Sequence, residues 1–104
     1  MTEALASFLR HLAVEKNASA HTIKAYREDL GQALLYWQTQ LGKNASVEQI
    51  ATRSVRGFIA HLHEQGLSRS TIARRLAAVR SWFRFLCRQG TLTSNPADGV
   101  RGYR

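Results

Sequence analysis

The sequence predicts an all-α fold, a bundle of four main helices plus one short helical turn. In four stretches of the chain, apolar residues recur at steps of three and four residues, as on one face of a helix. No stretch alternates polar and apolar residues as a half-buried strand does. Residues that favour helix starts and stops flank these stretches. With 104 residues, 44% of them hydrophobic, the chain has room for one domain with one core.

The first two helices follow from their apolar stripes and the residues at their ends. We expect one over about residues 3–16, stopped by Asn17, with an inner face of Leu5, Phe8, Leu9 and Leu12. The next begins after Ser19, a good N-cap, and runs to about Gln40, before Gly42. Its stripe is wide enough to face a core and comprises Ile23, Tyr26, Leu30, Leu34, Trp37 and Leu41.

A short turn and two further main helices complete the bundle. Residues 46–49 have capping-box form and predict one helical turn. Thr52 is expected to cap a third main helix that ends at about Gln65, with Val55, Phe58, Ile59 and Leu62 inward. A fourth main helix runs from the cap Ser68 to Gly90, and its core stripe is Ile72, Leu76, Val79, Phe83 and Leu86.

After Gly90 the composition changes. Asn95-Pro96 blocks continuation of the helix, and two glycines and the terminal arginines are typical of a linker. We therefore expect a helical domain over residues 1–94 and, over residues 95–104, the start of a linker to a further, absent domain, which the family resemblance described below implies to be catalytic.

The positive charge is confined to the second half of the chain. The formal net charge is +8, and residues 1–52 carry five basic and five acidic side chains, against ten and two in residues 53–104. Twelve of the fifteen cations are arginine, whose planar fork fits phosphate groups and guanine edges. A basic surface also suits anionic lipid or an acidic protein, but nucleic acid is favoured because the charge lies on an ordered helix.

The arginines of the fourth helix fan across one face. At 100° per residue, five of them span an arc of about 140° opposite the core stripe: Arg69, Arg74, Arg80, Arg84 and Arg88. No acidic residue stands between Glu64 and Asp98, and the residues between the arginines are small, so this face could approach a groove closely. The alternative is a solvated face, which normally mixes charges of both signs. Arg75 differs, because it lies at the edge of the apolar stripe, where stacking on Trp82 or pairing with an acid of another helix is as plausible as contact with DNA.

The start of the second helix is a weaker candidate. Its free N–H groups and positive dipole end suit a phosphate, and Thr22, Lys24 and Ala25 lie off the core face. Capping by Ser19 alone would also explain this segment.

Other sites are not indicated. The single cysteine, Cys87, lies in an apolar stretch and is expected to be a buried structural thiol. The four histidines lack metal-ligand spacing, no nucleophile motif is present, and neither a catalytic residue, a metal nor a cofactor is expected. The N-terminus does not resemble a signal peptide, and a reducing cytoplasm is expected.

Two segments resemble the core-binding domain of the tyrosine recombinases, the phage integrase and Xer group. Residues 19–30 (SAHTIKAYREDL) are similar to the family's Ser-x-x-Thr-x-x-x-Tyr-x-x-Asp-Leu. Residues 66–68 (GLS) and 70–86 (STIARRLAAVRSWFRFL) are similar to Gly-Leu-Ser and then Arg-x-Leu-Ser-Ala-Leu-Arg-x-Phe-Phe-x-Phe-Leu, and Asn95-Pro96-Ala97 falls where the domain ends. The order and spacing of these motifs cover nearly the whole chain, and bacterial Xer-type enzymes are the closest in appearance.

The resemblance implies a SAM-like domain that forms the N-terminal half of a clamp on duplex DNA, while a separate domain supplies catalysis. By position, it implies DNA contacts at Thr22, Lys24, Ala25, Ser70, Thr71 and Arg74, and the charge argument adds Arg69, Arg80 and Arg84. It implies a recombination site and other recombinase protomers as partners, with no small-molecule substrate, in bacterial cytoplasm at the nucleoid. Chromosome-dimer resolution and mobile-element insertion both stay open. The alternatives are a SAM-like protein-interaction module whose basic face meets an acidic partner and, less favoured, a stand-alone enzyme.

Overall fold

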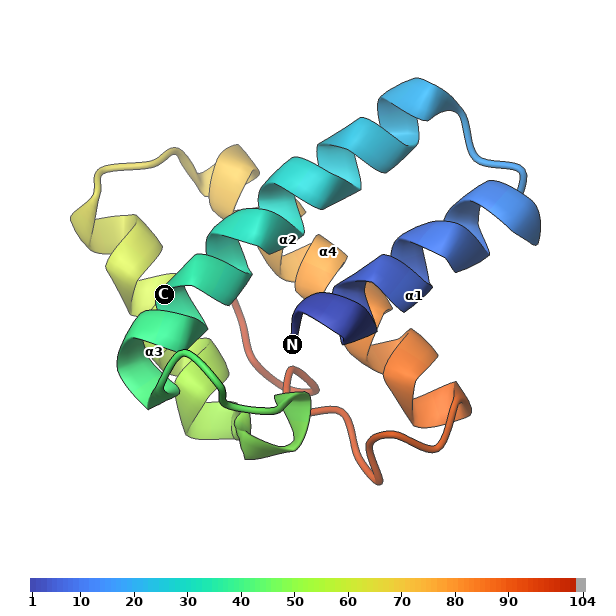
Figure 1. The fold of residues 1–104 in the computed structure, drawn as a ribbon. Helices are drawn as coiled ribbons and strands as arrows, with labels where there is room; N and C mark the ends of the chain where they lie inside the picture. The colour runs from blue at the N-terminus through green and yellow to red at the C-terminus, as the bar shows by residue number, and fades with distance from the viewer. Residues whose placement is uncertain (103–104) are drawn as a thin grey trace.

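Four α-helices and one 3₁₀ turn form the fold, as the sequence predicts. The computed structural model describes residues 1–102, and these contain no strand. The elements in chain order are α1 (Thr2–Val14), α2 (Ala20–Leu41), the turn η1 (Val47–Gln49), α3 (Thr52–Glu64) and α4 (Arg69–Arg88) (Figure 1). None of the described helices combines the length and the apolar character needed to cross a membrane.

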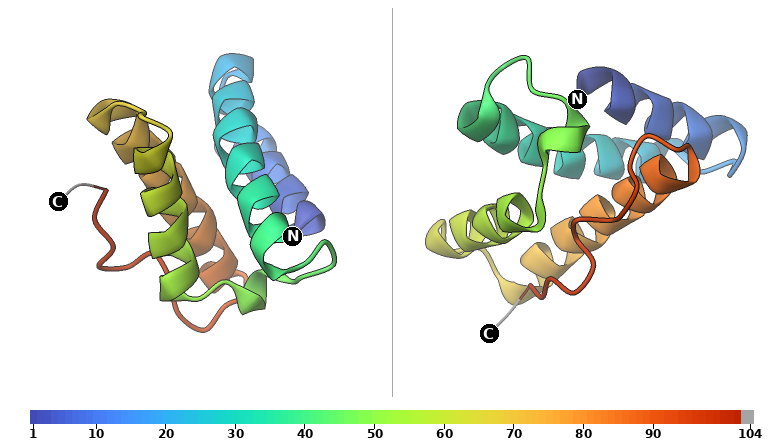
Figure 2. Two further views of the ribbon diagram at one scale, coloured as in Figure 1. Left: turned by 90° about the vertical axis from the view of Figure 1, so that its left-hand side faces the viewer. Right: turned by 90° about the horizontal axis from the view of Figure 1, so that it is seen from below.

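The helices pack as two pairs around one core. α1 lies along α2, α3 lies beside α4, and α2 crosses α4 between them (Figures 1 and 2). Trp37 of α2 and Phe83 of α4 pack ring to ring with centroids 5.8 Å apart, and Trp82 stacks on Phe83 at 5.2 Å. Both indole N–H groups are satisfied by backbone carbonyls, that of Trp37 by Ser54 at 2.9 Å and that of Trp82 by Ala4 at 3.2 Å. These bonds let two large aromatic side chains be fully buried without an unpaired polar atom.

The predicted helix ends are confirmed at most positions. Ser19 and Ser68 are the N-caps of α2 and α4, each accepting a hydrogen bond from the backbone N–H three residues later. Asn17 and Gly66 take positive φ angles of 49° and 78° after α1 and α3, as residues that end helices do. The prediction that Thr52 caps α3 was wrong, because Ala51 is the N-cap residue and its N–H donates to the Ser54 hydroxyl at 3.2 Å.

The C-terminal segment, residues 95–102, packs on the helices, whereas the sequence led us to expect a linker from residue 95. Pro96, Ala97 and Val100 are buried, and the last two are 0% and 3% exposed. A turn places these apolar residues on one side, with the Val100 N–H donating to the Ala97 carbonyl at 3.2 Å. The segment runs along α4 toward α3 (Figure 2, right). Its packing follows from the few apolar residues it contains, which fill space that the helices leave open.

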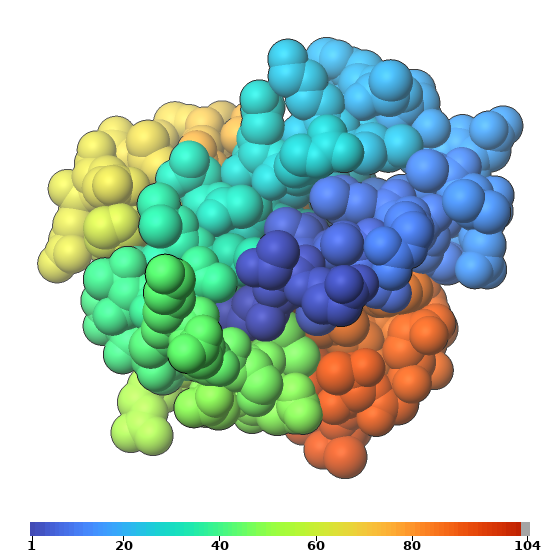
Figure 3. Space-filling view, in the orientation of Figure 1, coloured from blue at the N-terminus to red at the C-terminus, as the bar shows by residue number. Residues whose placement is uncertain are grey.

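α4 lies beneath the N-terminal helices on one side of the molecule. In Figure 3, α1 and α2 cover its middle, and residues near its two ends reach the surface on either side of them. Its buried face includes all five predicted core residues. Cys87, expected to be buried, is half-buried and packs against the core. The remaining face of α4 carries the arginines.

Candidate nucleic-acid interface

A cleft between α2 and α4 brings together three of the residues predicted to contact DNA. Its volume is about 280 Å³, and its lining includes Thr22 and Ala25 of α2 and Arg74 of α4. Small residues of α4, Ala77 and Ala78, line it as well. The two helices are distant in sequence, so this juxtaposition is a result of their crossing.

Both helices that border the cleft begin with the same cap. The Ser19 hydroxyl accepts from the Thr22 N–H at 3.1 Å, and the Ser68 hydroxyl accepts from the Thr71 N–H at 3.2 Å. Each serine hydroxyl also donates to the threonine hydroxyl, at 3.1 Å in α2 and 3.0 Å in α4. Thr22 and Thr71 therefore have their side chains fixed by the caps, and Lys24 and Ser70 are exposed beside them.

Asp29 is a residue of this site that the sequence analysis quoted in the family motif but gave no role. It is the only charged residue among the buried ones of the described chain, at 8% exposure. Its carboxylate accepts two hydrogen bonds from Arg74, from Nε at 3.0 Å and from Nη2 at 3.1 Å. Arg75 Nε lies 3.8 Å from the same carboxylate, too far for a hydrogen bond.

This cluster has a distinct charge balance. Two arginines share one carboxylate, so the cluster keeps one net positive charge at neutral pH. The hydrogen bond to Asp29, together with the attraction of its negative charge, raises the pKa of Arg74 above its ordinary value. The Arg74 side chain is nevertheless 59% exposed, whereas that of Arg75 is 20% exposed. The sequence left Arg75 open between a structural role and contact with DNA, and the structure places it against Asp29 of α2, whereas Arg74 stays at the surface.

The remaining predicted arginines divide into two groups. Arg69 and Arg84 are exposed, as is Arg88, and none of them has an acidic partner within residues 1–102. Arg80 is half-buried and faces the C-terminal segment. Its Nε donates to the Ala97 carbonyl at 3.4 Å and its Nη2 donates to the Val100 carbonyl. The structure therefore holds Arg80 by backbone groups and leaves Arg69 and Arg84 available to solvent.

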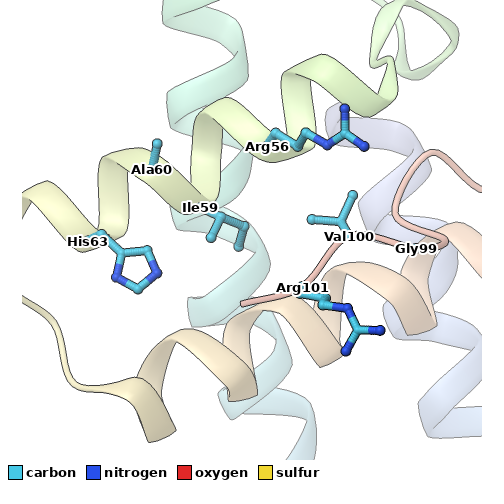
Figure 4. Close-up of a pocket in the computed structure, with 7 residues that line it drawn as sticks. All are labelled: Arg56, Ile59, Ala60, His63, Gly99, Val100 and Arg101. Carbon is cyan, nitrogen blue, oxygen red and sulfur yellow. The ribbon is translucent and has the colours of Figure 1, made fainter. Parts of the chain in front are cut away.

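A second hollow lies where the C-terminal segment meets α3. Its volume is about 300 Å³, and Arg56, His63 and Arg101 are among the residues that line it. Figure 4 shows the guanidinium groups of Arg56 and Arg101 spread apart, not converging on one point. The His63 ring is tied to the segment through Nε2, 2.9 Å from the Gly102 carbonyl. This hollow is a packing seam with a basic rim and does not concentrate charge as a catalytic site would.

The sequence is similar to that of one known family over most of its length. The family model for the phage integrase N-terminal SAM-like domain matches residues 5–90. The chain belongs to this family. It is similar to the tyrosine recombinase XerC of Pelotomaculum thermopropionicum, with 44% identity over 93 residues that cover 86% of this chain and 30% of the relative. It is also similar to the XerC proteins of Xanthomonas campestris (39% identity; 94% of this chain, 30% of the relative) and Pseudomonas aeruginosa (39%; 92% and 31%). No solved structure matches.

The chain spans about a third of the length of these curated relatives. As a phage integrase SAM-like domain, it has the all-helical architecture that the resemblance implied. Two of its tyrosines are half-buried: Tyr26 packs edge-on against Phe8 at 5.5 Å, and Tyr36 lies 5.0 Å from the His61 ring. Tyr103 lies outside the described residues.

Proposed function

We propose that this domain binds duplex DNA as the N-terminal half-clamp of a site-specific tyrosine recombinase. The observation that carries the proposal is the cleft between α2 and α4, which gathers Thr22, Ala25 and Arg74, on a helix whose exposed side also carries arginines without acidic partners in the described chain. An α-helix fits the major groove, and arginines along its exposed face suit both phosphate groups and base edges.

The electrostatic pattern supports this proposal over a simple solvated face. Arg84 and Arg88 lie four residues apart on α4 and repel each other, and within the described chain no carboxylate offsets them. A nucleic acid would remove this repulsion. Small residues at Ala73 and Ala77, both exposed, leave room for the backbone of α4 to approach a groove.

Salt-dependent binding to a labelled duplex tests the proposal. Half a clamp should bind mixed-sequence DNA with a Kd of about 10⁻⁴–10⁻⁶ M at physiological salt, and each phosphate contact should contribute about 0.9 to the slope of log K against log salt. Arg84→Ala and Lys24→Ala should each lower that slope. Lys43→Ala is the matched control, since Lys43 is exposed beyond the opposite end of α2.

The same titration separates DNA binding from the alternative, an interaction module for an acidic protein. Polyglutamate should displace the duplex poorly at equal charge concentration if grooves and phosphate spacing matter. Equal competition by polyglutamate, or salt-independent binding, would contradict a DNA-binding role. The proposal includes that this domain is part of a full recombinase, with other protomers as partners, in a bacterial cytoplasm. Assembly of the domain with a catalytic domain on recombination-site DNA tests this part.

A further inference from the structure

The pair formed by Asp29 and Arg74 combines two properties that ordinary surface ion pairs lack. The carboxylate is nearly buried, so its position is set by the packing of α2 on α4, whereas the guanidinium is mostly exposed. Surface arginines are usually free to move and lose side-chain entropy when they bind. Arg74 has already been ordered by its carboxylate partner before any ligand arrives.

The hydrogen bonds to Asp29 use only one edge of the guanidinium. Arginine has five N–H donors in a planar fork. Nε and Nη2 bond to the carboxylate, so one hydrogen of Nη2 and both of Nη1 remain. Two of these remaining hydrogens, one on each terminal nitrogen, are parallel and can make a second bidentate contact. The acceptor pair O6 and N7 of guanine in the major groove matches such a contact.

The charge of the pair disfavours the competing role of phosphate binding. Asp29 offsets part of the charge of Arg74 and occupies one edge of its guanidinium, which reduces its attraction for an anion but not its ability to donate hydrogen bonds to a neutral base. Arg75 lies against the same carboxylate and keeps it compensated, even while Arg74 engages a ligand. The unpaired arginines Arg69 and Arg84 are better placed for phosphates, because nothing neutralises them within residues 1–102.

We infer that Asp29 is a positioning residue that presents Arg74 as a reader of a guanine base edge and keeps it from acting as a general phosphate contact. This inference rests on the proposed DNA binding and assigns a role to a residue that does not itself touch DNA. It places sequence discrimination in the cleft between α2 and α4 and sequence-independent affinity on the exposed arginines of α4.

Binding of a mixed-sequence duplex, measured at several salt concentrations, tests whether Asp29 keeps Arg74 from contacting phosphates. Asp29→Asn frees Arg74 to take a phosphate, so the slope of log K against log salt should steepen by about 0.9. Glu28→Gln is the matched control, because it removes the same charge from the neighbouring, exposed position and should change the slope much less. In the Arg74→Ala background, Asp29→Asn should give no steepening. Circular dichroism of each variant provides the folded fraction by which binding is corrected.

Selection from a pool of randomised duplexes tests whether Arg74 reads a guanine base edge. The wild-type chain should enrich guanine at one position, and Arg74→Ala should lose that preference. Arg74→Lys is a second variant at this mostly exposed position, and it keeps the positive charge but not the planar guanidinium. It should therefore retain affinity for mixed-sequence DNA and lose the guanine preference. A wild-type chain that binds no DNA at low salt would overturn the proposed function. Normal DNA binding with an unchanged slope in folded Asp29→Asn, or a guanine preference that survives Arg74→Lys, would overturn this inference alone.

Discussion

At the scale of single residues, the Asp29 cluster joins stability and surface chemistry. A nearly buried carboxylate is costly unless it is paired and hydrogen-bonded, and Arg74 supplies both hydrogen bonds that the carboxylate receives from side chains. The partners are 45 positions apart, so the pair also fastens α2 to α4 where they cross. A change at Arg74 is therefore expected to act on folding as well as on the proposed DNA binding.

Arg74→Ala should lower the free energy of unfolding by about 1 kcal/mol. Hydrogen bonds to charged groups stabilise by about 1.5–3 kcal/mol, and the expected loss is smaller because Arg74 is 59% exposed and Arg75 remains beside Asp29. Urea denaturation measures this change. Arg84→Ala is the control and should stay within about 0.5 kcal/mol of the wild type. If the Arg74 variant were as stable as the wild type, the ion pair between Asp29 and Arg74 would make no net contribution to folding stability.

Much of the candidate site could be predicted from the sequence, but its charge pairing could not. Helical periodicity located Arg74 and Arg84 on the outer arc of α4, because the angle between residues of one helix depends only on their spacing. Asp29 stands at the Asp position of the family motif, but its pairing with Arg74 was not predicted, because a contact between helices 45 positions apart has no local signature. Arg80 was placed among the DNA-facing arginines by the same angular argument, although its angle also points at the C-terminal segment, whose packing depends on tertiary contacts.

At the scale of elements, α4 serves two surfaces at once. One face holds the aromatic centre of the core and the other carries the arginines, so a change confined to the core leaves the arginines in place as long as the helix stays folded. Phe83 is 0% exposed and lies between the rings of Trp37 and Trp82.

Phe83→Ala should cost about 3–5 kcal/mol of stability, because a buried ring leaves a cavity that a close-packed core fills only partly. Tryptophan fluorescence during urea denaturation reports this directly, since both tryptophans contact the deleted ring. Val14→Ala, at a position 80% exposed, is the control and should change stability by less than about 0.5 kcal/mol. DNA binding per folded molecule should be nearly unchanged, and a loss of binding in fully folded Phe83→Ala would contradict the separation of the two faces.

Arg80→Ala should loosen the C-terminal segment. The side chain of Arg80 holds the carbonyls of Ala97 and Val100, and loss of about 1 kcal/mol of local stability raises the open population about fivefold. Limited trypsin digestion should therefore cut after Arg101 several times faster than in Arg84→Ala, which removes an arginine without these bonds. Unchanged cleavage together with a shallower salt slope for DNA binding would show instead that Arg80 is a DNA contact.

Local sequence patterns predict the positions of the helices well, but they predict the cap residues less well. Ser19 and Ser68 act as predicted, because a serine hydroxyl reaches the backbone three residues on without help from the rest of the fold. α3 starts one residue earlier than a cap at Thr52 would allow, with the bond supplied by Ser54 from inside the helix. The C-terminal segment carries few apolar residues, and its packing depends on the gap it fills and on the hydrogen bonds from Arg80, neither of which is visible in the segment's own sequence.

At the scale of the whole molecule, the charge distribution matches the architecture. The half of the sequence that holds the net positive charge forms α3, α4 and the C-terminal segment, while α1 and α2 are balanced. α2 contributes to the cleft through its small and hydroxyl-bearing residues, Ala25 and Thr22. In the proposed DNA-binding role, α4 supplies affinity and α2 shapes the surface that faces the groove.

This chain alone should neither cut nor transfer a DNA strand. A tyrosine that attacks a phosphodiester needs arginines converging on the same phosphate to stabilise the developing charge. Tyr26 and Tyr36 are held in aromatic contacts, and the arginines of α4 are spread along a helix about 30 Å long. Such an arrangement can position DNA for a catalytic domain, which gains rate from correct geometry. Incubation with supercoiled plasmid and with a nicked duplex, followed by denaturing electrophoresis, should reveal no relaxation and no covalent adduct. An adduct that disappears in Tyr103→Phe would contradict the non-catalytic role, because it would identify a nucleophile outside the described residues.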